Sequence, residues 1–295
     1  MAAVSGRRRR WRWLLVLLVG FLLWCASVLV IAVTGNANLV PTVVLLGSFL
    51  VPVTAVVWNF DHEASSELTA QRVFAAFVVG GVLGVLGASL LEAWLLQEGP
   101  LMYIGVGLIE ELVKALALVV VAWGLRRYTT RDGVVLGAAV GFGFASLETS
   151  GYAFNALLTE HGLSLGALID TELLRGILAP LGHGLWTAIL GGVMFHAARS
   201  RGRIRFTWGL LGTYVLVAVL HAVWDAMRGI AVALTLLLTA TRAQMISIEY
   251  GKVPRVHPAQ ELLFVVIQFA GLVVISLIAV GVLFLIWRRW ARSAP

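Results

Sequence analysis

The sequence contains few charged residues and almost no cysteine. Only 13% of its 295 residues are charged, whereas 60% are hydrophobic. Soluble domains are about one quarter charged and about one half apolar, so these fractions exclude an ordinary water-soluble protein. They also exclude intrinsic disorder, which requires low hydrophobicity and high charge. The single cysteine, Cys25, lies in an apolar run, which leaves no disulfide framework and no thiolate metal cluster.

Lysine is almost absent as well, because only Lys114 and Lys252 contribute to the 22 basic residues. The net charge of +7 and the pI of about 10.3 could suggest nucleic-acid binding. The basic residues nevertheless fall in short blocks between apolar runs, the pattern that sets membrane topology. We therefore expect a lipid bilayer around the chain and no nucleic-acid partner. The bias toward Arg, Ala, Val and Leu indicates a bacterial genome of high GC content, and hence the bacterial cytoplasmic membrane.

Eight apolar runs are each long enough to cross a bilayer, whose core of about 30 Å requires roughly 20 apolar residues in helical conformation. They cover residues 13–34, 38–58, 73–96, 101–125, 134–158, 174–198, 206–229 and 261–287. The sequence therefore predicts an all-α fold, a polytopic bundle of about eight transmembrane helices. Because the first run is too long for a signal peptide and has no clear cleavage site, we expect it to be an uncleaved anchor.

Basic residues at the ends of these runs predict the orientation, since positive charges concentrate on the inner side. With both termini inside, sixteen basic residues face inward and five outward, whereas Lys114 lies within a run. The inward residues are Arg7, Arg8, Arg9, Arg10, Arg12, Arg72, Arg126, Arg127, Arg131, Arg199, Arg201, Arg203, Arg205, Arg288, Arg289 and Arg292; the outward ones are Arg175, Arg228, Arg242, Lys252 and Arg255. We expect the segments 159–173 and 230–260 to face outward.

Four consecutive runs carry polar side chains in their interiors. A charged group at mid-bilayer costs about 2.5–3.5 kcal/mol even on the scale from insertion experiments. Such groups must therefore be satisfied by each other, by water or by an ion. They are Glu110, Glu111 and Lys114 in the fourth run, Glu148 and Tyr152 in the fifth, His183 and Thr187 in the sixth, and His221 and Asp225 in the seventh.

Five of these polar groups, Glu110, Glu111, Glu148, His183 and His221, share one predicted depth. Counted along helices at 1.5 Å per residue, they lie roughly 10–18 Å below the outer boundary of the membrane. Each run also repeats a spacing of four, as between His221 and Asp225, which places both residues on one helix face. Each helix is thus expected to present one polar stripe to a common centre.

Two histidines and three carboxylates are the ligand types of a zinc-like site with a carboxylate base. We expect a divalent metal, with Zn²⁺ as the ion, bound by His183, His221 and Glu148. A bound divalent ion lowers the pKa of its water to around 7, as peptide hydrolysis at neutral pH requires.

The remaining charged groups have expected roles in the same chemistry. Glu110 or Glu111 is expected to be the general base for water, and Lys114 to keep a neighbouring carboxylate ionised or to position a carbonyl. Asp225 is expected to orient His221 as a hydrogen-bond acceptor. Simpler interpretations stay open, because a single buried histidine is more often a core residue than a ligand. The two glutamates could also form no more than an ion pair with Lys114.

At these residues the sequence resembles the PrsW family of intramembrane proteases, within the CAAX-protease and bacteriocin-processing superfamily. That family has a Glu-Glu-x-x-Lys helix, a Glu-Asn-x-x-Tyr helix and two helices that each bear a histidine, and residues 100–230 match this order. Thr149 stands where the family usually has asparagine. The resemblance implies cleavage of a membrane protein or peptide substrate, such as an anti-sigma factor. It also implies a metalloprotease, although some relatives in the superfamily use a glutamate-activated water instead.

Other functions remain as alternatives at this point. Buried Glu, His and Asp also mark the ion pathways of transporters, but the sequence has no inverted repeat. A protease-like scaffold that binds substrates without cutting them is a third possibility. For the protease, we expect residues 1–100 to form three N-terminal spans, 101–230 the catalytic four-helix core, and 231–295 an outer loop and the last span. The oligomeric state does not follow from the sequence.

Overall fold

The computed structural model describes residues 11–65, 68–99, 101–160 and 162–292, with the side chains of the last helix described as far as residue 288. The predicted inner arginines Arg7–Arg10 and the expected boundary at Pro100 lie outside the described residues. Helices account for almost all of the structure. They are α2 (Arg12–Thr34), α3 (Val40–Glu63), α4 (Ala70–Val78), α5 (Gly84–Leu95), α6 (Met102–Ala122), α7 (Thr130–Leu157), α8 (Leu165–Leu178), α9 (His183–Ala198), α10 (Trp208–Thr239), α11 (Arg242–Glu249) and α12 (Pro258–Arg292).

Short irregular elements connect some of these helices. A π-helical turn, Val79–Leu83, makes α4 and α5 one continuous rod. Short 3-10 turns precede α3 at Ala37–Leu39 and separate α8 from α9 at Ala179–Leu181. The only strands among the described residues are β1 (Leu158–Thr159) and β2 (Gly162–Leu163), which pair in an antiparallel hairpin between α7 and α8.

The prediction of a polytopic helical bundle is confirmed. Seven helical segments of the described residues are long and apolar enough to cross a membrane: Arg12–Thr34, Ala37–Glu63, Ala70–Leu95, Thr130–Leu157, Leu165–Ala198, Trp208–Thr239 and Pro258–Arg288. The one remaining predicted span, 101–125, corresponds to α6. This helix has 21 residues but contains Glu110, Glu111 and Lys114. Because these three ionisable groups lie close together in one helix, α6 is not among the seven segments, and its membrane crossing stays a prediction.

The sixth predicted span, 174–198, is part of a longer and interrupted structure. Its helix begins at Leu165, because the Ser164 side chain accepts a hydrogen bond from the Ala167 backbone N–H and caps α8. Pro180 lies in the 3-10 turn that ends α8, and α9 begins after Gly182. Most of the segment expected as the outer loop 159–173 is therefore helical. The segment 230–260 is also partly helical, since α10 continues to Thr239 and α11 follows.

Glycines bring α7 and α9 into close contact. Gly133, Gly137 and Gly141 lie one turn apart on the face of α7 that meets α9. A Cβ atom added at Gly137 would lie 2.3 Å from the carbonyl oxygen of Thr187, and one at Gly141 would lie 2.2 Å from that of His183. Only glycine fits at such distances, and small residues one turn apart are typical of close helix packing in membranes. The contact fixes the first turn of α9, which carries His183, against α7.

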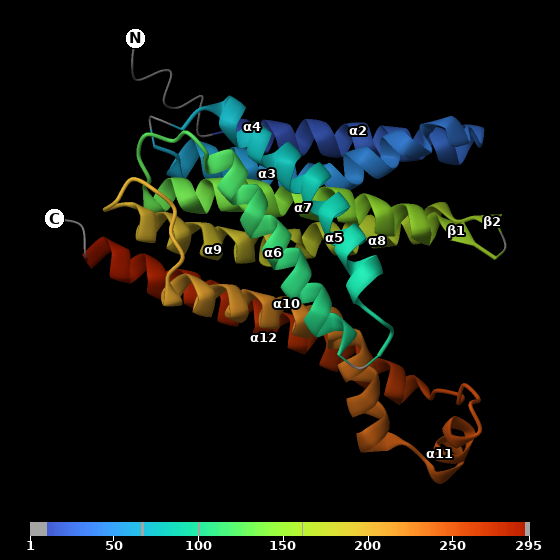
Figure 1. The fold of residues 1–295 in the computed structure, drawn as a ribbon. Coiled ribbons are helices and arrows are strands. Elements are labelled where there is room, and N and C mark those ends of the chain that lie inside the picture. The colour runs from blue at the N-terminus through green and yellow to red at the C-terminus, as the bar shows by residue number, and fades with distance from the viewer. Residues whose placement is uncertain (1–10, 66–67, 100, 161, 293–295) are drawn as a thin grey trace.

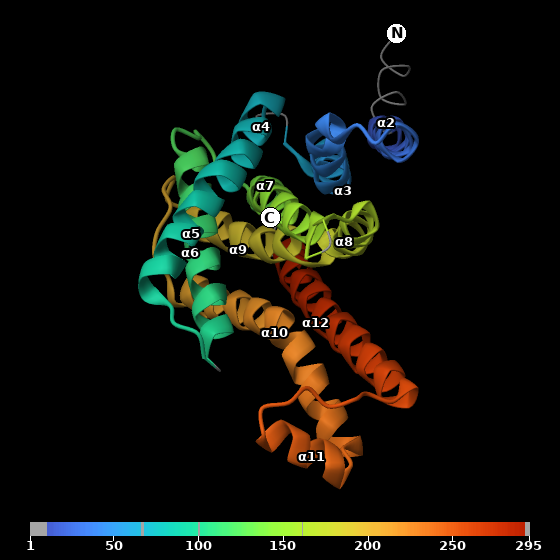
Figure 2. The same cartoon turned by 90° about the vertical axis from the view of Figure 1, so that its right-hand side faces the viewer.

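The bundle is built around α7, with α3 and α4 on one side and α9 and α10 on the other (Figure 2). The α6 and α10 helices pack against each other and cross the direction of α7 (Figure 1). The beginning of α2 and the end of α12 lie at the same end of the bundle (Figure 1). This arrangement agrees with both termini being on one side of the membrane, and the identity of that side stays a prediction.

Candidate active site

Seven of the nine polar residues predicted for the site lie in one cluster between α6, α7, α9 and α10. The rings of its two histidines, His183 and His221, have their centroids 4.8 Å apart. The indole ring of Trp186 lies against both of them and is fully buried. The cluster consists of Glu110, Glu111 and Lys114 from α6, Glu148 from α7, His183 from α9, and His221 and Asp225 from α10.

Lys114 lies at the centre of the buried half of this cluster and has no exposed surface. Its Nζ atom is 2.7 Å from Glu111 Oε1 and 3.3 Å from Glu110 Oε2. It also lies 2.8 Å from His183 Nδ1 and 4.3 Å from the centre of the Phe144 ring. One lysine therefore contacts both neighbouring glutamates, although their directions differ by about 100° around the helix.

His221 is fully buried and is oriented by Glu111. Its Nδ1 atom lies 3.0 Å from Glu111 Oε1, so Nδ1–H donates to this carboxylate. The Nε2 atom has no hydrogen-bond partner among the described residues. It lies 3.2 Å from Asp225 Oδ2 and 3.6 Å from Glu110 Oε2. Atoms with lone pairs that approach so closely require a proton or a metal ion between them.

His183 is also held by a carboxylate, but through Nε2, whereas His221 is held through Nδ1. Its Nε2 atom lies 3.0 Å from Glu148 Oε2, which accepts the Nε2–H hydrogen bond. Its Nδ1 atom therefore faces the inside of the cluster, 3.9 Å from Glu110 Oε2. The ring also contacts the Phe144 ring at a centroid distance of 5.4 Å. Each histidine is thus held through one nitrogen by a carboxylate, and the other nitrogen points toward Glu110.

Arg175 of α8 belongs to the site and was missed by the sequence reasoning, which counted it only as an outer flanking charge. Its Nη2 atom donates to Glu148 Oε2 at 2.6 Å, and its Nε atom donates to Thr149 Oγ1 at 2.9 Å. The guanidinium also lies over the Tyr152 ring, 4.2 Å from its centre. Thr149, the position that departs from the family pattern, thus helps to hold Arg175. The sequence did contain a signal for this role, because Arg175 lies only eight residues before His183.

The two predicted supporting residues lie at the edges of the cluster. Tyr152 is half exposed, and its ring contacts the Arg175 guanidinium. Thr187 is fully buried in the α7–α9 contact, where its Oγ1 atom has no hydrogen-bond partner among the described residues. Trp186 and Trp224 pack edge to face against each other, in agreement with a packing role.

The cluster is closed on one side and accessible on the other. Glu111, Lys114 and His221 have no exposed surface. The side chains of Glu148, Asp225 and Arg175 are 19%, 26% and 27% exposed. Water and a substrate can therefore reach His183, whose side chain is 11% exposed, from the side of these three residues, whereas Lys114 and His221 are sealed.

The donor set fits a metal ion. One ligand atom each from Glu110, His183 and His221 can be chosen so that all lie within 4.8 Å of one another. Metal-binding histidines typically donate their second ring N–H to a carboxylate, and Glu111 and Glu148 accept these bonds here. The ammonium of Lys114 also contacts Glu110 and His183, so it would compete with an ion for these two groups.

Comparison with known proteins gives the family of the chain. Residues 10–248 match the family described as PrsW family intramembrane metalloprotease. The chain belongs to this family. It is also 28% identical to Protease PrsW of Halalkalibacterium halodurans over 191 residues, which cover 62% of this chain and 82% of that protein. No solved structure matches the chain. All residues of the cluster lie within the matched region.

Membership establishes the broad activity of the protein. It is a multi-pass membrane protein and a hydrolase that acts as an intramembrane protease on protein substrates in the membrane. The metalloprotease description also supports a metal ion, in agreement with the Glu110, His183 and His221 set. The transporter alternative is therefore not favoured.

Proposed function

We propose that the cluster is the active site of this protease and that Glu110, His183 and His221 hold a zinc ion. The observation that carries the proposal is the orientation of the two imidazoles. Each gives one nitrogen to a carboxylate and directs the other toward Glu110. Two histidines and a carboxylate form the usual protein ligand set of hydrolytic zinc sites. When bound, the ion would supply an activated water and polarise the scissile carbonyl.

In this proposal Glu110 is the third metal ligand, the role that the sequence analysis expected for Glu148. The Glu148 carboxylate is already engaged by the Arg175 guanidinium and by the Nε2–H of His183, so it is an orienting group in this proposal. Glu111, which has no exposed surface, orients His221 in the same way. Neither residue is then available to accept a proton from water.

Asp225 is the proposed general base. It is a partly exposed carboxylate next to the ligand atoms, with Oδ2 at 3.2 Å from His221 Nε2, and it forms no ion pair with an arginine or lysine of the described residues. It can accept the proton of a water between the two histidines and return it to the leaving amine. Lys114 contacts the carboxylates of Glu110 and Glu111 from the buried side and fixes their positions.

A metal-free mechanism is the second candidate, and one observation favours it. The Lys114 ammonium lies 2.8 Å from His183 Nδ1 and 3.3 Å from Glu110 Oε2, between the same groups that would hold the ion. In this arrangement Glu110 itself would activate the water. The two mechanisms differ in their metal requirement and in whether Glu110 or Asp225 is the base.

The proposal extends to the substrate and the topology. We infer a membrane protein or peptide as substrate, with an anti-sigma factor as the type that the resemblance to the PrsW family implies, and the bacterial cytoplasmic membrane as the location. The excess of basic residues supports both termini inside. Residues 101–230 would form the catalytic core, flanked by 1–100 and by 231–295.

The decisive experiment combines cleavage of a transmembrane peptide in detergent with elemental analysis of the purified protein. We expect near-stoichiometric zinc, and we expect His183→Ala and His221→Ala each to lose both zinc and cleavage. His196→Ala is the matched control, because His196 lies on α9 but contacts Thr130 at the other end of the helix. Cleavage that survives both substitutions would refute the assignment of the site. Cleavage without zinc that still requires Glu110 would favour the metal-free mechanism.

A further inference from the structure

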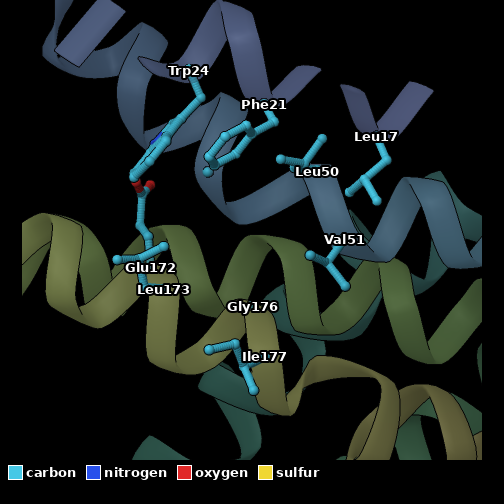
Figure 3. Close-up of a pocket in the computed structure, with 10 residues that line it drawn as sticks. Leu17, Phe21, Trp24, Leu50, Val51, Glu172, Leu173, Gly176 and Ile177 are labelled. Carbon is cyan, nitrogen blue, oxygen red and sulfur yellow. The ribbon is translucent and has the colours of Figure 1, made fainter. Parts of the chain in front are cut away.

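A buried carboxylate outside the active site joins α8 to the N-terminal helices. Glu172 of α8 is 3% exposed, and its Oε2 atom accepts a hydrogen bond of 2.8 Å from Trp24 Nε1 of α2. Its Oε1 atom has no hydrogen-bond partner among the described residues. Figure 3 shows the carboxylate directed from α8 toward the Trp24 ring. An acidic group inside a membrane-spanning segment is costly, so a contact of this kind is expected to have a function.

The α3 helix is shaped to receive this carboxylate. A Cβ atom added at Gly47 would lie 2.2 Å from the Glu172 carboxyl carbon. The Glu172 side chain therefore fills the space that any other residue at position 47 would occupy. The contact unites three helices, since Trp24 belongs to α2, Gly47 to α3 and Glu172 to α8. We call these three residues the α8 anchor.

The anchor borders both an apolar core, in which Trp24 packs in one cluster with Leu168 of α8, and a gap in the packing. A cavity of about 190 Å³ lies beside it, between α2, α3 and α8 (Figure 3). Phe21, Leu50, Val51 and Ile177 line this cavity. The nearest atom to a Cβ added at Gly176, on the same helix, is Val51 Cγ2 at an ordinary distance of 3.7 Å. The hydrogen bond between Trp24 and Glu172 thus bridges a region where apolar contacts are incomplete.

The position of α8 matters to the active site because of Arg175. This residue follows Glu172 by less than one turn of the same helix and reaches Glu148 and Thr149 of α7. The α8 helix is separated from α9 by the turn Ala179–Leu181, so the tight α7–α9 contact does not fix α8 directly. A shift of α8 would therefore move Arg175 relative to Glu148, and Glu148 orients His183.

We propose that Glu172 is a positioning residue of the protease: through Trp24 and Gly47 it fixes α8, so that Arg175 holds Glu148 and His183 in the reactive arrangement. The proposal rests on the proposed function of the Glu148–His183 pair. It gives the N-terminal helices a role in catalysis, although they contribute no group to the cluster. Misplacement of a catalytic group by about 1 Å can reduce turnover by about 10²-fold, so a tenfold loss is a reasonable expectation here.

A double-mutant cycle tests the proposal on the full-length protein. Glu172→Leu is expected to lower kcat about tenfold and to change KM less than twofold, because it removes the acceptor of the Trp24 N–H. Glu172→Gln keeps a carbonyl oxygen for this bond and should retain most of the turnover. In an Arg175→Ala background, which we expect to retain roughly 1–10% of kcat, Glu172→Leu should cause no further loss. A purely structural defect would instead multiply with the Arg175→Ala defect and would overturn the proposal.

Gly20→Ala is the control for the α2–α3 contact, since a Cβ there would meet only the flexible end of Leu50, which lines the cavity beside the anchor but takes no part in the Trp24–Glu172 hydrogen bond. Hydrogen exchange of the backbone in 165–178 gives a readout independent of activity. Glu172→Leu should speed hydrogen exchange in this segment, whereas Gly20→Ala should leave the exchange rate unchanged. Unchanged exchange, or unchanged kcat in Glu172→Leu, would overturn the proposal. Full activity of His183→Ala would instead refute the proposed function, so the two failures are distinguishable.

Discussion

Arg175 and Glu148 form an ion pair of 2.6 Å between α8 and α7, and the same carboxylate oxygen lies 3.0 Å from His183 Nε2. The pair links a helix that contributes no ligand to a histidine at the centre of the cluster. It also determines which nitrogen of His183 faces Glu110, because Nε2–H is used by Glu148. The reactive arrangement of His183 is thus expected to depend on a residue of the preceding α-helix.

Substitutions at Arg175 should separate geometry from charge. Arg175→Ala should lower kcat by roughly 10- to 100-fold, since it frees Glu148 to rotate away from His183. Arg175→Lys keeps the charge but cannot make the two bonds to Glu148 and Thr149 in one plane, so it should recover only part of the loss. Peptide-cleavage kinetics would measure both variants. Arg228→Ala is the control, because Arg228 lines a separate cavity together with Val253. Equal losses of kcat in Arg175→Ala and Arg228→Ala would argue against a specific role of Arg175.

The carboxylates behind the histidines should tune the affinity for zinc. Loss of such a partner typically costs 10- to 100-fold in metal affinity. Glu111→Gln and Glu148→Gln are therefore expected to weaken zinc binding by about this factor, whereas Glu110→Gln should weaken it more, as a lost ligand does. Competition with a zinc chelator, followed by elemental analysis, would measure the three affinities. If Glu110→Gln binds zinc as tightly as the unmodified protein, Glu110 is not a ligand.

The glycines of α7 predict a stability effect that does not depend on chemistry. Gly137→Ala should lower the thermal unfolding temperature, because its methyl group would lie 2.3 Å from the Thr187 carbonyl oxygen and force α7 and α9 apart. Overpacking of this kind costs about 1–3 kcal/mol. Gly151→Ala on the same helix is the control, since no atom lies within 4 Å of the added carbon. It should leave stability unchanged or raise it slightly; a similar loss in both variants would contradict the close-contact argument.

Much of the site could be predicted from the sequence because membrane burial makes polar residues conspicuous. Glu110, Lys114 and His221 stand out in apolar runs, and a common depth with spacing of four indicated that they meet. The structure brings these three residues into the cluster, together with Glu111, Glu148, His183 and Asp225. The partner of each group was not predictable, because it depends on the rotation of each helix and on side-chain rotamers.

The helix α8 was missed for a related reason. The acidic residues Asp170 and Glu172 interrupt the apolar run before residue 174, so hydropathy alone ended the predicted span there. The capping by Ser164 and the turn at Pro180 were local signals that a separate helix precedes α9. Without that helix, Arg175 was assigned to a boundary and Glu172 to a loop. Both errors concern charged residues whose partners lie on distant helices.

The position of the cut in a substrate follows from the accessible side of the cluster. Glu148, Asp225 and Arg175 are its partly exposed members. The positive-inside assignment puts Glu148 and His183 in the outer half of the bilayer, roughly 10–18 Å below its surface, with Arg175 nearer to that surface. A peptide bond within a helix is shielded because its carbonyl is hydrogen-bonded, whereas the last turn of a helix leaves its carbonyls free. A segment that is extended or unwound near the outer surface should therefore react faster than the centre of a helix. We expect cleavage in the outer third of the substrate's transmembrane segment or just beyond it.

Mass spectrometry of the fragments from a single-span substrate in liposomes would locate the cut, with His221→Ala as the inactive control. A cut in the cytoplasmic third would contradict the predicted orientation or the depth of the site. If unwinding of the substrate helix limits cleavage, a glycine pair introduced near the outer end of its transmembrane segment should increase the cleavage rate.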